Sequence, residues 1–392
     1  MIKENKELTI RIDDLCRRIY FLIAGLYTFG YIIGSANFSN LGAALMQRIT
    51  NFTFEISVVV LAILTIINFV NISVRKIIFI AAGLPAVLCI ISFSSNQLIL
   101  PFLFITAYPN SISLKKLSLF LCKTMLIATA IIIILCILGI FPDNTSLRVN
   151  VLRHSLGFIT PNAFGNTIIL AFFLKIFGSW DNWKVKDTIF WVVLTLVTYF
   201  YANSRASFYL SVFILILLWI HKNRIIPKKI EKIVYDIPVP VFLICLVLSI
   251  GLTIYFSKNQ NNLYYFYNNL FSGRPYYLIH FYNNYGIQFF GHKNIYAVGY
   301  ADMQASNGFL QWMGIDNSYV FISIYFGVFY LVYMFIIYFF AWKNVKEKKN
   351  WGGIIYLTLL AIMGLTENYM HTIALNFVFY VFADYLMNHK IE

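Results

Sequence analysis

Residues 117–162 read LSLFLCKTMLIATAIIIILCILGIFPDNTSLRVNVLRHSLGFITPN. Residues 117–141 are mostly apolar, and a segment of this length lets an α-helix cross the hydrocarbon core of a bilayer. Because backbone groups inside a membrane must be hydrogen-bonded within their own segment, this part predicts a spanning helix. The residues that follow are polar and carry Arg148 and Arg153 ahead of Gly157 and Pro161. We therefore expect residues 142–160 to form an outer loop through which the chain re-enters the membrane.

The same pattern continues along the whole chain. Hydrophobic residues make up 60% of it and charged residues 12%, whereas roughly 25% of a soluble domain is charged. This composition predicts an all-α polytopic membrane protein forming a single domain over residues 1–392, with about 12 spans. The expected spans lie near 18–36, 56–73, 77–94, 97–109, 117–141, 160–178, 187–203, 205–221, 238–257, 317–341, 352–366 and 369–388. The fourth is short for a full crossing, so counts of eleven and thirteen remain open.

Basic residues predict the orientation. With twelve spans and both termini in the cytoplasm, all but seven of the 30 Lys and Arg lie at cytoplasmic connections or helix ends, as the positive-inside rule requires. The net charge of +14 is then a topology signal and implies no nucleic-acid partner, while basic clusters beside helices suit anionic lipid. The charged start, residues 1–18, is not typical of a cleaved signal peptide. Five cysteines fall in or beside apolar spans and predict packing residues rather than disulfides.

Four arginines depart from this charge bias, because Arg148, Arg153, Arg205 and Arg274 all fall in expected outer connections. The guanidinium group stays charged and pairs bidentately with phosphate oxygens. Arg148 and Arg153 precede a helix that starts near Pro161, where backbone N–H groups also favour anions, and Asn162 lies in its first turn. The set predicts an anion-binding cradle. The alternative is that each arginine reaches a lipid headgroup by itself.

The longest polar segment, residues 258–316, is expected to be a large outer loop, and a loop of this size is more often functional than idle. It is rich in Tyr and Phe with Asn between them. Aromatic faces suit the C–H faces of sugars, and the amides and hydroxyls suit sugar hydroxyls. An equally open interpretation is that the rings lie in the headgroup layer, where Tyr and Trp are enriched.

Several short runs carry a resemblance to a known family. They are RHSLGFITPN at 153–162, NSR at 203–205 at a helix start, SGR at 272–274, YG and FG at 285–291, and DNSY at 316–319 opening the next helix. In this order and placement, over roughly residues 140–330, they resemble the Wzy-type polymerases of capsular polysaccharide and O-antigen, in the O-antigen ligase/polymerase superfamily. The related ligases have a histidine in the large loop just before the next helix, where this chain has Asp316, so the resemblance favours a polymerase.

The resemblance implies glycosyl transfer on the outer face of the bacterial cytoplasmic membrane. A chain carried on undecaprenyl pyrophosphate would pass to another lipid-linked repeat unit, with a flippase and a chain-length regulator as candidate partners. The alternatives are an O-antigen-ligase-type transferase and a non-enzymatic flippase for lipid-linked oligosaccharides. A flippase is expected to have charged residues at mid-membrane depth and repeat-like halves, and neither is found in the sequence.

Pyrophosphate leaves readily when its charge is held, so the four arginines are expected to act electrostatically, with no cofactor and no metal. Asp316 and His154 are the preferred bases for the acceptor hydroxyl, although Asp316 suits a helix N-cap equally well and His154 a backbone hydrogen bond. The other residues expected to contact the pyrophosphate or the glycan are Arg148, Asn162, Tyr319, Glu367 and His371. Arg153, Arg205 and Arg274 are the main expected ligands of the pyrophosphate, and Arg148 is expected to lie behind them.

Overall fold

The computed structural model describes residues 2–39, 41–68, 74–93, 98–109, 112–148, 150–223, 225, 227–298 and 313–388. These residues are mostly helical, as the composition predicts, and contain one two-stranded sheet. Their elements are α1 (Ile2–Gly34), α2 (Ala43–Asn68), α3 (Val74–Phe93), α4 (Ile99–Thr106), α5 (Leu114–Ile137), β1 (Thr145–Arg148), β2 (Val151–His154), α6 (Pro161–Ser179), α7 (Val185–Phe200), α8 (Arg205–Lys222), α9 (Lys228–Val234), α10 (Pro238–Lys258), α11 (Asn262–Leu270), α12 (Arg274–Tyr285), α14 (Ser318–Tyr325), α15 (Gly327–Glu347), α16 (Trp351–Met363) and α17 (Val378–Asn388).

Helix α6 lies at the centre of the bundle. It is buried over most of its length and packs against α5, α8 and α16. The helix begins sharply because Pro161 occupies its first turn, where no N–H is needed, and the Thr160 hydroxyl accepts a hydrogen bond from the Ala163 N–H at 3.1 Å. A helix that is apolar all round can be buried on all sides, so α6 provides a rigid support for its own N-terminal residues.

Six described helices are long and apolar enough to cross a membrane. They are Ala44–Asn68, Leu114–Ile137, Pro161–Ser179, Arg205–Lys222, Pro238–Lys258 and Gly327–Glu347. Most of them expose apolar side chains on the outside of the bundle, such as Leu196 on neighbouring α7, Trp219 on α8 and Val247 on α10. Exposed apolar flanks of this extent suit a lipid environment. The expected count of twelve crossings is not established by these helices.

Three expected spans differ from the helices observed. Residues 97–109 contain only the short helix α4. The span at 317–341 is divided into α14 and α15 at Phe326 and Gly327, and the last span is helical only from Val378. Some ends of the expected spans lie outside the described residues, namely residues 69–73, 94 and 97. Apolar composition predicted each segment but not where its helix is interrupted, because the interruptions depend on packing with other segments.

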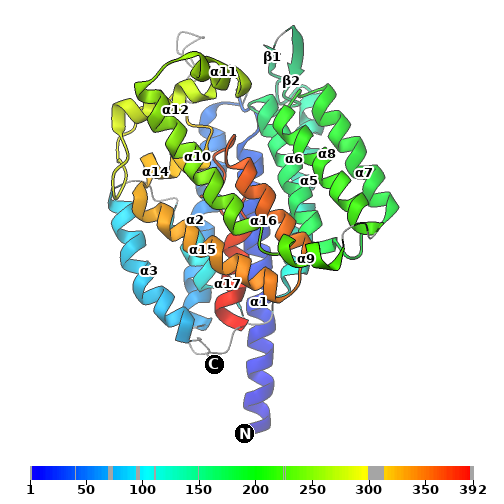
Figure 1. The fold of residues 1–392 in the computed structure, drawn as a ribbon. Helices are drawn as coiled ribbons and strands as arrows, with labels where there is room; N and C mark the ends of the chain where they lie inside the picture. Colours follow the sequence, from blue (N-terminus) through cyan, green and yellow to red (C-terminus); the bar gives the residue numbers. More distant parts are fainter. Residues whose placement is uncertain are drawn as a thin grey trace.

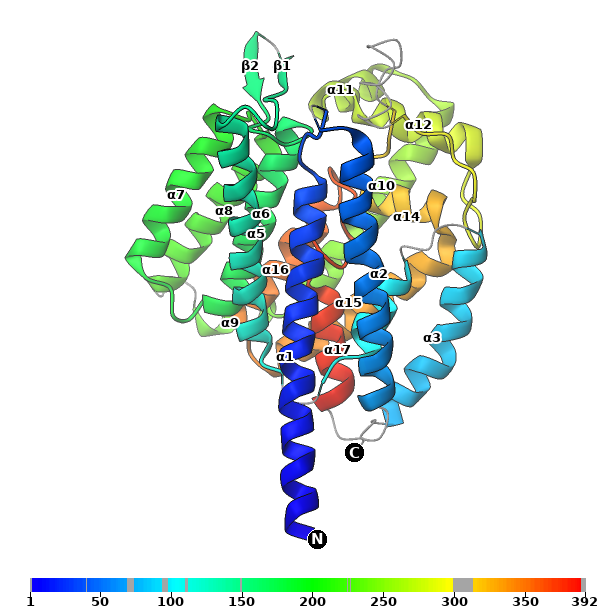
Figure 2. The same ribbon diagram turned by 180° about the vertical axis from the view of Figure 1, so that it is seen from behind.

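The two polar segments lie at one end of the molecule. The hairpin β1–β2 and the helices α11 and α12 stand at the end opposite both termini (Figures 1 and 2). The hairpin belongs to the expected outer loop 142–160. No strands were expected in this loop. Behind it, Asn37 and Ile159 tie this loop to the end of α1 through backbone hydrogen bonds of 2.8 and 2.9 Å. Within the expected loop 258–316, residues 299–312 lie outside the described residues.

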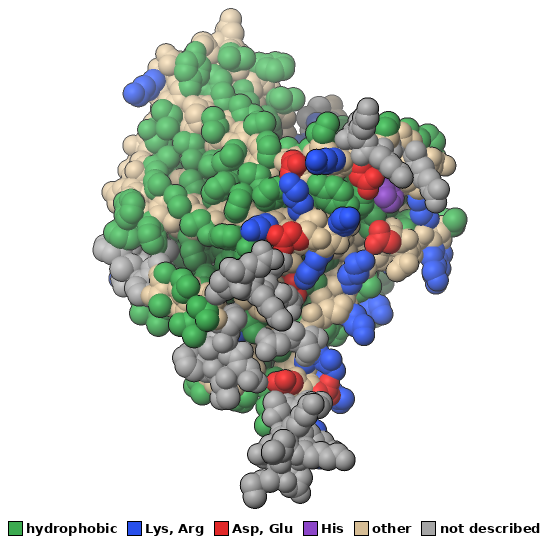
Figure 3. Space-filling model, turned by 60° about the horizontal axis from the view of Figure 1, so that its bottom comes forward, with side chains coloured by type: hydrophobic (Ala, Val, Ile, Leu, Met, Phe, Trp, Pro, Cys, Tyr) green, Lys and Arg blue, Asp and Glu red, His purple; other side chains and the backbone are tan. Residues whose placement is uncertain are grey.

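The opposite end has a different surface. Seen from the side of the termini, Lys and Arg gather with a smaller number of acidic side chains, while the flank beside them is apolar (Figure 3). Several pairs at connections on this side are salt bridges, including Lys115 with Asp181 and Lys346 with Asp236. The molecule therefore has one strongly charged end and one end that carries the hairpin and the aromatic helices.

Candidate functional site

Three of the four arginines converge from separate segments. Arg148 ends β1, Arg205 begins α8 and Arg274 begins α12. Burial, together with the positive charges of Arg205 and Arg274, lowers the pKa of Arg148, so its guanidinium group lies close enough to each of the other two to be affected by their charge. Arg148 also donates a hydrogen bond to the hydroxyl of Ser272, which joins the hairpin to the chain just before α12. A cluster of like charges that is held in place by the fold is suited to bind an anion.

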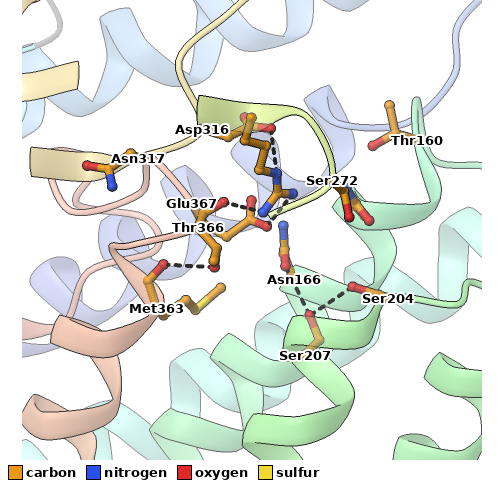
Figure 4. Close-up of polar contacts among 12 residues, drawn as sticks. Thr160, Asn166, Ser204, Ser207, Ser272, Asp316, Asn317, Met363, Thr366 and Glu367 are labelled. Carbon is orange, nitrogen blue, oxygen red and sulfur yellow. Dashed lines mark hydrogen bonds and ion pairs between the residues drawn. The ribbon is translucent and has the colours of Figure 1, made fainter. Parts of the chain in front are cut away.

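Arg274 differs from the other two because it contacts two carboxylates. Its Nε lies 3.2 Å from Oδ2 of Asp316, and its Nη2 donates to Oε1 of Glu367 at 3.0 Å. Its Nη1 donates to the backbone carbonyl of Thr366 at 2.6 Å. Figure 4 shows Asp316 on one side of this arrangement and Glu367 and Thr366 on the other. The guanidinium group thus joins α12, the segment before α14 and the segment after α16.

Glu367 is the most enclosed charged side chain of this cluster, with a side-chain exposure of 7% against 25% for Asp316. The pKa of Glu367 is raised to about 7, mainly by burial, with an opposing effect of Arg274 and a smaller raising effect of nearby Asp316. Burial also raises the pKa of Asp316 while Arg274 lowers it. The carboxyl group of Glu367 can therefore gain a proton near neutral pH, and its titration is coupled to that of Asp316.

A row of polar side chains continues from Glu367 into the bundle. Asn166 on α6 lies close enough to Glu367 to lower its pKa, and its Nδ2 donates to the Tyr369 hydroxyl at 3.0 Å. The Ser207 hydroxyl donates to Asn166 Oδ1 at 3.0 Å and receives a hydrogen bond of 3.1 Å from Ser204 (Figure 4). Buried polar groups that are fully hydrogen-bonded hold one geometry. The row therefore fixes the carboxylate against the N-terminal ends of α6 and α8.

The side chain of Arg153 holds neighbouring segments together. Its Nε donates to the carbonyl of Ala202 at 2.9 Å, and its Nη2 donates to Oδ1 of Asn162 at 2.6 Å. These contacts join β2 to the turn before α8 and to the first turn of α6. Asn162 is therefore a partner of Arg153. The sequence expectation ranked Arg153 above Arg148, whereas the structure brings Arg148 into the cluster with Arg205 and Arg274.

The hairpin register separates His154 from this cluster. Ser146 pairs with Arg153 and Arg148 with Val151, so Arg148 and Arg153 share one face of the hairpin. His154, paired with Thr145, lies on the other face, where its Nδ1 is 2.6 Å from Oδ2 of Asp143. The two faces of a hairpin point in opposite directions. His154 therefore forms a separate pair with Asp143, away from the arginines.

Two other expected site residues lie in the core. Tyr319 is fully buried, and its hydroxyl donates to the carbonyl of Ala361 at 2.8 Å, so it packs the bundle rather than facing the site. His371 stacks on Phe321 with ring centroids 4.8 Å apart. The N-cap of α14 is Asn317, whose Oδ1 accepts from the Val320 N–H at 3.0 Å. This leaves the carboxylate of Asp316 available for Arg274.

Some members of the site were not predicted as such. Asn166, Ser204 and Ser207 are ordinary polar residues of apolar helices, and only their occurrence in positions expected to be buried signals a role. The sequence did contain one signal for the hairpin, because Asn150 lies at its turn. The φ angle of Asn150 is 63°, a conformation that asparagine tolerates at hairpin turns. Among the described residues, no group of three or more His, Cys, Asp or Glu side chains has a geometry that could hold a metal ion.

Comparisons of the chain with family models, with curated proteins and with solved structures find no match.

Proposed function

We propose that this protein is a polysaccharide polymerase: a glycosyltransferase that joins polyprenyl-pyrophosphate-linked oligosaccharide repeat units at the outer face of a bacterial cytoplasmic membrane. The observation that carries the proposal is that Arg148 lies near both Arg205 and Arg274, and that Arg274 in turn binds the carboxylates of Asp316 and Glu367. The cluster lies at the end of the molecule that carries both polar segments. A site with fixed cations beside a proton-accepting carboxylate suits the departure of a pyrophosphate and the activation of a hydroxyl.

The arginines have distinct parts in this reaction. Arg148 and Arg205 bind the pyrophosphate of the donor, where their charge stabilises the negative charge that grows as the sugar–oxygen bond breaks. Among the described residues, no carboxylate forms a salt bridge with either of them, so their charge remains to be neutralised by a ligand. Arg274 is already paired and instead holds Asp316 and Glu367 in position.

In the transfer step, the acceptor hydroxyl attacks the anomeric carbon of the donor sugar and a new carbon–oxygen bond forms. The bond from that carbon to pyrophosphate breaks, and the electron pair leaves with the pyrophosphate. The proton of the hydroxyl passes to the carboxylate pair of Asp316 and Glu367. A base whose pKa lies near 7 suits this task, because it is substantially ionised at neutral pH and still accepts a proton.

Polymerisation by the purified protein tests the proposal. The substrate is the lipid-linked repeat unit extracted from the source cells, and the products are separated as a ladder. We expect Arg205→Lys to lower kcat/KM roughly ten- to a hundredfold, since a charge-assisted hydrogen bond contributes about 1.5–3 kcal/mol and lysine cannot reproduce the guanidinium fork.

The matched control is Arg48→Lys, because Arg48 lies on α2 and has no contact with the cluster among the described residues. This variant is expected to retain wild-type product ladders. An unchanged ladder in Arg205→Lys, at equal protein and detergent concentration, contradicts the proposed role of the arginines. The absence of any ladder with wild-type protein contradicts the function itself.

A further inference from the structure

A cavity of about 570 Å³ lies between α1, α2 and the segment that follows Glu367. Its walls include Tyr27 and Tyr31 of α1, Thr50 and Thr53 of α2, and His371 and Thr372. Small-molecule sites commonly occupy about 300–1,000 Å³. The cavity therefore has the size of a binding site, and neither the arginines nor the two carboxylates of the cluster form its wall.

The hydroxyl groups in the wall offer acceptors. Thr53 and Thr50 donate their hydroxyl hydrogens to backbone carbonyls of their own helix at 3.0 and 3.1 Å, and Ser35 does the same at 2.6 Å. Each hydroxyl oxygen keeps lone pairs that can accept a hydrogen bond. The imidazole ring of His371 also lines the cavity. A ligand rich in hydroxyl donors would satisfy these atoms.

Tyrosine side chains connect the cavity to the charged cluster. Tyr31 in the cavity wall lies close enough to Tyr369 to interact with it electrostatically. Tyr369 in turn accepts a hydrogen bond from Asn166 and lies close enough to Glu367 to interact with its charge. On the opposite side, Ile159 of the wall belongs to the outer loop that carries the hairpin. A ligand bound in the cavity would therefore be connected to Glu367 through Tyr31 and Tyr369.

A second cavity, lined by apolar side chains, allows a comparison. It measures about 260 Å³, lies between α3 and α15, and is lined almost wholly by aliphatic and aromatic groups such as Phe79, Phe329 and Ile336. Placing a hydrocarbon chain against unpaired hydroxyl oxygens costs their hydration without replacing it. The cavity beside α1 is the more polar of the two and is thus a poorer site for a lipid tail than the one between α3 and α15.

We infer that the cavity between α1 and α2 binds a short oligosaccharide. Its hydroxyls would donate to Thr50, Thr53 and Ser35, and the rings of Tyr27 and Tyr31 would contact the apolar faces of the sugars. The inference rests on the proposed function in one respect: the sugars would be those next to the hydroxyl or anomeric carbon that reacts beside Glu367. The cavity then selects the substrate by its glycan.

Cysteine protection tests this assignment. Ser35→Cys and Thr50→Cys place a thiol in the cavity wall from two different helices, and the unsubstituted chain sets the background labelling of its own cysteines. The purified variants are labelled with a small maleimide in the presence of the oligosaccharide released by mild acid from the lipid-linked pool of the source cells. With this probe at about ten times its dissociation constant, labelling is expected to slow roughly tenfold, since only the unoccupied fraction reacts.

Undecaprenyl phosphate, which carries the lipid without the glycan, is the second probe and is expected to leave the labelling rate unchanged. The matched control is Ala82→Cys in the apolar cavity, where the oligosaccharide is expected to have no effect. Protection of Ser35→Cys and Thr50→Cys by undecaprenyl phosphate alone, or by neither probe, overturns the assignment. Because labelling requires no turnover, protection without polymerisation would reject only the proposed function, and polymerisation without protection would reject only the glycan site.

Discussion

At the scale of single residues, the same side-chain type has different roles because its neighbours differ. Arg274 is enclosed by Asp316 and Glu367, whereas Arg148 meets a serine hydroxyl and two other arginines. Arg153 donates to a carbonyl and an amide oxygen. The charge of Arg274 is therefore neutralised by carboxylates, and Arg148 is affected by the like charges of two other arginines. Arg153 joins three segments of the chain. Nothing in the four local sequences distinguishes these roles.

The stability of the fold should depend on Arg274. Arg274→Met leaves two partly buried carboxylates beside each other without a cation, and the loss of one partner from a buried ion pair costs about 3–5 kcal/mol. We expect a large drop in the thermal unfolding midpoint in detergent, which becomes smaller as the pH falls and the carboxyl groups are protonated. The control is Lys115→Met, which removes an exposed pair with Asp181 and should change stability by about 1 kcal/mol or less. Equal losses in both variants would contradict this account.

The pKa of Glu367 predicts a pH dependence. If the carboxylate pair accepts the proton, kcat/KM rises with pH until about 7 and then levels off, because the base must be ionised. Glu367→Gln should remove this inflection as well as lower the rate. Activity measured from about pH 5.5 to 8.5 checks the expectation, and a profile with the same inflection in Glu367→Gln would assign the titration to another group.

The raised pKa of Glu367 also makes the stability of the fold depend on pH. The pKa of Glu367 in the folded protein lies above the value of about 4.3 for an unfolded chain, so the folded state binds the proton more tightly. Its contribution to stability is complete below pH 4.3 or so and is lost as the pH rises through about 7. Wild type should lose more stability over this window than Glu367→Gln.

At the scale of elements, the break between α14 and α15 packs against the segment that follows α12. Gly327 adopts φ 85°, and a Cβ atom there would lie 2.3 Å from the carbonyl oxygen of Phe289. The backbone of residues 289–292 packs against this break through hydrogen bonds, including Phe329 N–H to the Phe289 carbonyl at 3.0 Å. A glycine is required at this position both by its conformation and by the close approach of another segment.

Substitution of Gly327 should therefore disrupt the break. Gly327→Ala imposes about 1–2 kcal/mol for the left-handed conformation and a further cost for displacing the 289–292 segment. The control is Gly251→Ala in α10, where nothing lies within 4 Å of the added Cβ. The control should be neutral or more stable by about 0.5–1 kcal/mol, as alanine is a better helix former. Thermal unfolding of both variants in detergent measures the difference, and a tolerated Gly327→Ala would mean that the segment moves freely.

At the scale of the whole molecule, the two ends have different chemistry. The hairpin, α11 and α12 stand opposite the termini (Figure 1), while Lys and Arg gather at the end that carries the termini, beside an apolar flank (Figure 3). This polarity accounts for the basic connections in the sequence and for the exceptional position of the four arginines. It also places the cavity between α1 and α2 beside the outer loop.

Labelling of intact cells tests the orientation. Asn269→Cys lies in the exposed end of α11 and should react with a membrane-impermeant maleimide added outside. Lys186→Cys, at the exposed start of α7, should react only after the membrane is permeabilised, because positive residues favour the cytoplasmic side. Labelling of Lys186→Cys alone in intact cells would reverse the expected orientation.

The sequence by itself determined that this is a helical membrane protein with polar segments around residues 142–160 and 258–316, because apolar length and charge distribution are properties of short stretches. It also singled out Arg205, Arg274, Asp316 and Glu367 as candidates. Only the tertiary structure decided that Asp316 and Glu367 share Arg274, that Arg148 joins the cluster, and that Tyr319 and His154 lie elsewhere. Most of these outcomes depend on contacts between residues far apart in the chain, such as Arg148 and Ser272, which are 124 positions apart, and their burial and charge balance arise only when the helices pack.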